Sequence, residues 1–70
     1  MLADFATAEQ SFRDMGARPH ESRLLRDWGH TLIALGRTDE GRAKLRAARD
    51  LMAELGITRE ADELTAELAG

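Results

Sequence analysis

WGHTLIALGRTDEGRAKLRAA, residues 28–48, is the stretch that decides the fold of this 70-residue chain. Apolar residues recur at helical spacing on both sides of a short turn, Gly36-Arg37-Thr38: Leu25, Trp28, Leu32 and Leu35 before it, and Leu45, Ala48, Met52 and Leu55 after it. Two helical patterns that meet at a short turn predict a helical hairpin. Gly29 and Gly41 stand where the two helices would approach closely.

One further helix is expected on each side of the hairpin, so the chain is predicted to be all-α, with helices at about 2–15, 19–35, 39–55 and 58–69. Glycine follows the first three patterns, at positions suited to a left-handed helix end. Pro19 suits the first position of the second helix. Thr38 or Asp39 is expected to cap the third helix, and Thr58 the fourth.

The second predicted helix is apolar around more than half of its circumference. A helix with so wide an apolar arc must be covered on two sides. We therefore expect it to be the central helix, packed against both of its neighbours in sequence, with Trp28 in the core.

The chain contains an internal repeat of helix pairs. A shift of forty positions superposes apolar positions and a helix-ending glycine: Phe5 on Leu45, Ala8 on Ala48, Phe12 on Met52, Met15 on Leu55, Gly16 on Gly56, Leu24 on Leu64 and Trp28 on Leu68. A repeat of helix pairs is typical of an α-solenoid built from antiparallel hairpins.

These residues resemble the tetratricopeptide repeat, whose unit is a pair of antiparallel helices. The pattern is carried by Trp28-Gly29, Leu32, Gly36, Asp39-Glu40, Leu45 and Ala48, with Gly41 where the family usually has alanine. The spacing is similar to a longer variant found in bacterial regulatory proteins. The resemblance implies one TPR-like domain over residues 1–70, with a full helix pair at 19–55 flanked by half repeats at 1–18 and 56–70.

The resemblance also implies a non-enzymatic module that binds a partner protein or peptide. The family's ligand surface is the concave face, which here maps to Arg23, Arg26, His30 and Ile33. A basic strip with a histidine suits an acidic peptide. The alternative is that Arg23 and Arg26 only pair with Glu63 and Glu67 of the fourth helix.

Composition narrows the classes of function. The net charge of −3 argues against nucleic-acid binding, and a DNA-binding helix-turn-helix is disfavoured for that reason. The chain has no cysteine, so disulfides and thiolate metal sites are excluded. The longest uncharged run, 28–36, is too short to cross a bilayer. We expect a cytoplasmic protein.

No catalytic or cofactor motif stands out. Neither Ser11 nor Ser22 has a base at an activating spacing. His20 and His30 are ten residues apart on one helix, or about 15 Å, so they cannot share a metal ion. We expect no enzymatic activity, no cofactor and no metal.

The outer helices each have only one neighbour, which leaves apolar side chains to be covered. These are Phe5, Phe12, Met15, Leu64 and Leu68. We therefore expect self-association, as a symmetric dimer. One alternative is a structural or oligomerisation segment without a peptide ligand. Another is a regulatory segment of a larger bacterial signalling protein, such as a cyclase, an ATPase or a transcriptional activator.

Overall fold

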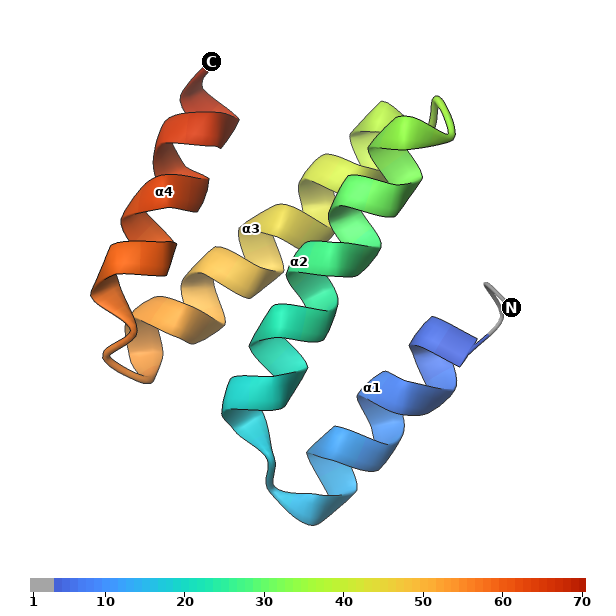
Figure 1. Cartoon of the computed structure of the whole chain (residues 1–70), viewed down its shortest axis with the longest axis vertical. Coiled ribbons are helices and arrows are strands. Elements are labelled where there is room, and N and C mark those ends of the chain that lie inside the picture. The colour runs from blue at the N-terminus through green and yellow to red at the C-terminus, as the bar shows by residue number, and fades with distance from the viewer. Residues whose placement is uncertain (1–3) are drawn as a thin grey trace.

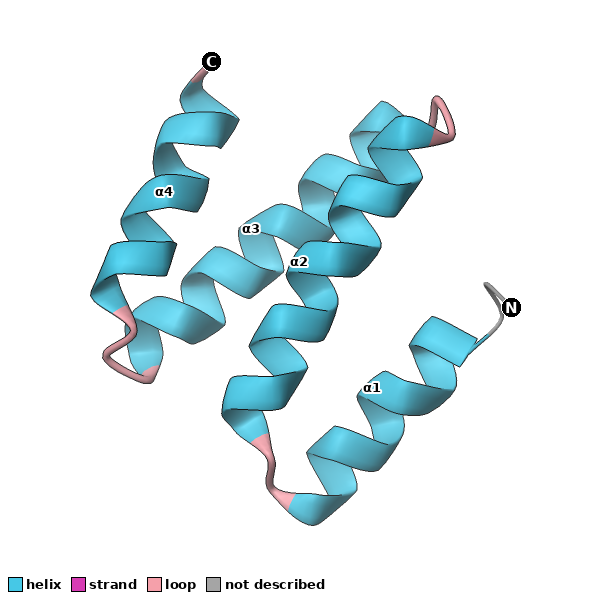
Figure 2. Cartoon of the chain, viewed as in Figure 1, coloured by secondary structure: helices cyan, strands magenta, loops and turns pink. Residues whose placement is uncertain are grey.

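The computed structural model describes residues 4–70, and the chain is all-α (Figures 1 and 2). Its helices are α1 (Asp4–Met15), α2 (Arg18–Ala34), α3 (Thr38–Glu54) and α4 (Thr58–Ala69). Each runs antiparallel to the next. The predicted bounds of the last three are correct to within one residue, whereas positions 2 and 3 of the first lie outside the described residues.

The three turns between helices are copies of one another, spaced twenty residues apart. Gly16, Gly36 and Gly56 have φ of 73°, 85° and 80°. The amide of the following residue donates to the carbonyl oxygen five residues earlier, from Ala17 to Phe12, Arg37 to Leu32 and Ile57 to Met52, each at 2.8 Å. This is the Schellman ending, which needs a left-handed residue and therefore favours glycine.

The predicted helix starts are wrong in detail. Arg37 and Ile57 hold the cap positions of α3 and α4, without a side-chain cap bond, and Thr38 and Thr58 are already helical. The turns are so short that the residue after the glycine both ends one helix and begins the next. For the same reason α2 begins at Arg18, which places Pro19 second in that helix.

The hydrophobic core lies among α2, α3 and α4. Its buried members are Leu25, Leu45, Ala48, Leu51, Met52, Ala61, Leu64 and Leu68. Helix α1 contributes no buried residue among those described, and it packs against α2 alone. The radius of gyration is 11.6 Å, close to the roughly 11 Å expected of a compact domain of this length. The four helices thus form a compact antiparallel array.

Helices α2 and α3 approach each other closely where Gly29 faces Gly41. A Cβ atom built on Gly29 would lie 2.8 Å from the carbonyl oxygen of Gly41, and one built on Gly41 would lie 2.6 Å from the carbonyl oxygen of Gly29. Both positions therefore require glycine, and the close approach of the two helices that the sequence predicted is present. The contact aligns the two longest helices as one tight hairpin.

Among residues 4–70, no helix combines the length and the apolar character that crossing a membrane requires.

Candidate functional site

An open groove of about 570 Å³ lies between α1, the second half of α2 and the first half of α3. Helix α2 forms its floor and α1 and α3 form its sides. Its lining consists of Phe5, Ala6, Trp28, Thr31, Leu32, Leu35, Arg37, Glu40, Ala43 and Lys44. The groove is mainly apolar, with charged side chains from α3 and the preceding turn on one side.

Trp28 is the central side chain of the groove. Its ring stacks on that of Phe5, with centroids 5.7 Å apart and planes within 5° of parallel. The Nζ atom of Lys44 lies 3.9 Å from the centroid of the Trp28 ring, a cation–π contact. The indole is half-buried rather than fully in the core. The expectation of a core tryptophan was therefore only partly right, because α1 covers α2 incompletely.

Leu35 stands at one end of the groove and remains 55% exposed. It is the last residue before Gly36, and Leu55 occupies the equivalent place before Gly56. Leu55 is 36% exposed and does not line the groove. Leu35 is therefore a protruding apolar side chain next to an apolar hollow, and Leu55 is its natural control.

The charges at the groove have both signs. Arg37 and Glu40 form an ion pair at 2.6 Å on the exposed rim. Lys44 follows Glu40 by one helical turn, and the exposed Ala43 lies between them in sequence. That spacing predicts an ion pair between Glu40 and Lys44. In the structure Glu40 instead contacts Arg37, and Lys44 contacts Trp28.

The residues predicted for a concave binding face do not form one open strip. Arg26 pairs with Glu60 of α4 at 2.9 Å, and His30 Nε2 lies 2.9 Å from a carboxylate oxygen of Glu67. Ile33 packs against the core beside Gly41, and Arg23 is exposed.

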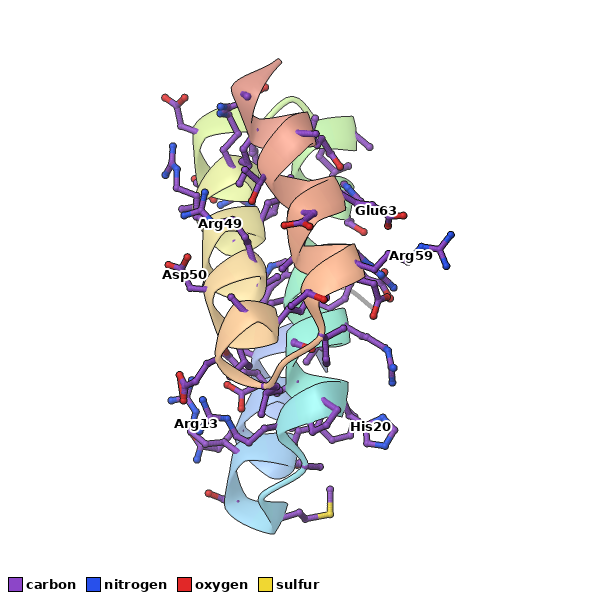
Figure 3. All side chains as sticks on the ribbon, turned by 90° about the vertical axis from the view of Figure 1, so that its left-hand side faces the viewer. Arg13, His20, Arg49, Asp50, Arg59 and Glu63 are labelled. Carbon is purple, nitrogen blue, oxygen red and sulfur yellow. The ribbon has the colours of Figure 1, made fainter. Side chains whose placement is uncertain are left out.

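Ion pairing between α2 and α4 was the alternative interpretation of this strip, and the partners differ from those predicted. Equivalent positions of the repeat are forty residues apart, whereas the side chains that meet are 34 and 37 apart. Figure 3 shows Arg59 and Glu63 projecting on the same side of the molecule as His20, with Arg49 and Asp50 on the opposite side. Peptide binding by the predicted strip stays a prediction.

The residues proposed for self-association lie in different environments. Leu64 and Leu68 are buried, since α4 turns its apolar stripe onto α3, and Arg42 donates a hydrogen bond to the carbonyl oxygen of Leu68. Phe12 is half-buried against His20, with ring centroids 5.7 Å apart, and Met15 is 68% exposed. Phe5 lines the groove. Self-association stays a prediction, and of these five residues Phe5 is the one at the groove.

Glu21 is a buried carboxylate that the sequence pattern did not predict. It is 3% exposed and lies at the junction of α1 and α2. Its oxygens are 3.4 Å from Arg13 of α1 and 3.2 Å from Arg18. Positions 41 and 61, in the equivalent places of the next two helices, hold glycine and alanine, so the spacing signals a small side chain here and not a carboxylate.

Among the described side chains, no three histidine or carboxylate groups gather as metal ligands. Comparisons of the chain with protein-family models, curated proteins and solved structures found no match. The groove of Phe5, Trp28 and Leu35 is therefore the candidate site on geometric grounds alone.

Proposed function

We propose that this chain is a non-enzymatic protein–protein interaction module of the tetratricopeptide type, and that its groove binds the partner. The observation that carries the proposal is the exposed Leu35 beside the half-buried Phe5–Trp28 stack. Tryptophan and neighbouring apolar side chains in an open hollow are typical of the anchor points of protein interfaces. The volume of the groove, about 570 Å³, lies within the range of ligand-binding clefts.

Two features support the tetratricopeptide-type architecture. The same glycine turn recurs at 16, 36 and 56, so the chain repeats one helix-and-turn unit. The central hairpin is held by the backbone contact between Gly29 and Gly41. Repetition of a helical unit that packs on its sequence neighbours is the basis of solenoid proteins.

The groove is a better binding surface than the strip on α2. Arg26 and His30 already contact carboxylates of α4, so an acidic ligand there would have to displace Glu60 and Glu67. Burying Leu35 removes apolar surface from water, which is the favourable term in most protein association, and it breaks no ion pair between helices.

A capture experiment tests the location of binding. The immobilised chain is exposed to lysate of the cells that encode it, as wild type and as Leu35→Asp, Leu55→Asp and Arg26→Glu. We expect Leu35→Asp to lose the captured protein, because a carboxylate would enter the apolar groove. Leu55→Asp places the same change at the equivalent turn outside the groove, and it should retain the captured protein. Loss with Arg26→Glu and retention with Leu35→Asp would place binding on the α2–α4 face and overturn the proposal.

A further inference from the structure

We infer that the occupant of the groove is a second copy of this chain, in a twofold dimer whose α3 helices run antiparallel. This inference rests on the proposed function, because it names the partner of that same groove. In a twofold interface the same patch faces itself, so the patch must be its own complement. The shape of the groove meets this condition, because the protruding Leu35 lies beside the hollow lined by Phe5 and Trp28 on one surface. The Leu35 side chain of each copy would then face the hollow of the other copy.

Charge supplies the second argument. Glu40 and Lys44 both line the groove and are one helical turn apart on α3. Arg37 also lines the groove and pairs with Glu40, so a wholly acidic partner would meet Glu40 and a wholly basic partner would meet Arg37 and Lys44. An antiparallel α3 of a second copy brings its Lys44 opposite Glu40 and its Glu40 opposite Lys44, so both contacts are attractive. Each adds to or replaces a contact within the chain, that of Glu40 with Arg37 and that of Lys44 with Trp28. Ala43 is exposed between them and leaves room for the two helices to approach.

The surface area indicates a weak, reversible dimer. The accessible surface of the chain is 4432 Å², close to the roughly 4,400 Å² expected of a folded monomer of this mass. The folded chain is thus as compact as a monomer of its mass. A standard interface covers about 800 Å² on each side, nearly a fifth of this surface and more than one groove provides. We expect a dissociation constant on the order of 100 µM.

The test exchanges the charges of Glu40 and Lys44 and measures dimerisation by sedimentation of the full chain. Concentrations up to about 0.5 mM are used, where such a dimer predominates. Glu40→Lys alone creates two Lys–Lys contacts across the twofold axis, and Lys44→Glu alone creates two Glu–Glu contacts. Each should weaken dimerisation by roughly tenfold. An equimolar mixture of the two variants pairs opposite charges again, as does the double variant, and both should dimerise like the wild type.

Arg46→Glu and Asp50→Lys are the matched controls. These residues also stand one turn apart on α3 and are exposed, but they lie outside the groove. They should leave dimerisation unchanged, and circular dichroism checks that every variant stays folded.

A wild-type chain that is monomeric at the highest concentration overturns the inference. A dimer whose dissociation constant is unchanged by Glu40→Lys and by Lys44→Glu overturns it as well. If Leu35→Asp still abolishes capture from lysate in that case, the groove binds another protein and the proposed function survives. If Leu35→Asp changes neither capture nor sedimentation, both fail.

Discussion

Gly41 is the residue at which we expect a single added methyl group to lower the stability of the fold most. In the structure, the added carbon would meet the carbonyl oxygen of Gly29 at 2.6 Å and the Cγ1 atom of Ile33 at 2.5 Å. Backbone cannot move aside as a side-chain tip can, so α2 and α3 must separate. Overpacking typically costs about 1–3 kcal/mol, which exceeds the roughly 1 kcal/mol that alanine gains over glycine in a helix.

We therefore expect Gly41→Ala to lower the free energy of unfolding by about 1 kcal/mol, measured by urea denaturation. Ala47→Ser adds one atom at an exposed position of the same helix, and it should change stability by less than about 0.5 kcal/mol. A Gly41→Ala chain that is more stable than the wild type would mean that the close approach contributes nothing.

Single residues also show what the sequence could and could not predict. The glycine pair at 29 and 41 was predictable, because glycine on each of two facing apolar stripes indicates that the helix backbones approach closely. The burial of Glu21 was not, because it depends on Arg13 arriving from another helix. Contacts between helices require relative positions that spacing within one helix does not contain.

At the scale of the element, the attachment of α1 depends on its aromatic side chains. Phe5 stacks on Trp28 and Phe12 lies against His20, with no buried residue among those described in α1. We expect Phe5→Ala to expose the only tryptophan of the chain and to lower stability by about 1 kcal/mol.

Quenching of Trp28 fluorescence by acrylamide measures this exposure. Phe12→Ala is the control, since it removes a similar contact from the same helix at the end away from Trp28. It should weaken the attachment of α1 with a smaller effect on quenching. Equal quenching in the Phe5→Ala variant and the wild type would show that Phe5 does not cover the indole.

The bounds of the last three helices were predictable to within one residue, whereas the groove was not predictable from the sequence. Glycine predicted the helix ends correctly, because each turn contains a residue with positive φ, a conformation that residues other than glycine rarely adopt. Threonine did not predict the capping residues of α3 and α4 correctly, because the residue that caps a helix depends on the length of the turn that precedes the helix. The helical spacing of apolar residues predicted that the side of α2 carrying Trp28 is apolar, but it did not predict how much of that side α1 covers.

The structure of the whole molecule is less symmetrical than the internal repeat of the sequence implies. The forty-residue shift makes α1 equivalent to α3 and α2 equivalent to α4, and it leaves α1 and α4 as outer helices with one neighbour each. In the structure α4 buries Leu64 and Leu68 on α3, whereas α1 touches only α2 and leaves the groove open. The core is thus a three-helix unit, and α1 is an addition to it that forms one wall of the candidate site.

Removing one outer helix at a time tests this asymmetry. Without residues 1–16 the core of α2, α3 and α4 keeps all its buried apolar residues. We expect that chain to unfold cooperatively in urea, with the free energy of unfolding lowered by about 2 kcal/mol for the lost aromatic and ionic contacts. Without residues 57–70 the core loses Ala61, Leu64 and Leu68, and cooperative unfolding should disappear. The reverse result, a cooperative chain without α4 and a non-cooperative one without α1, would place the core around α1 and α2.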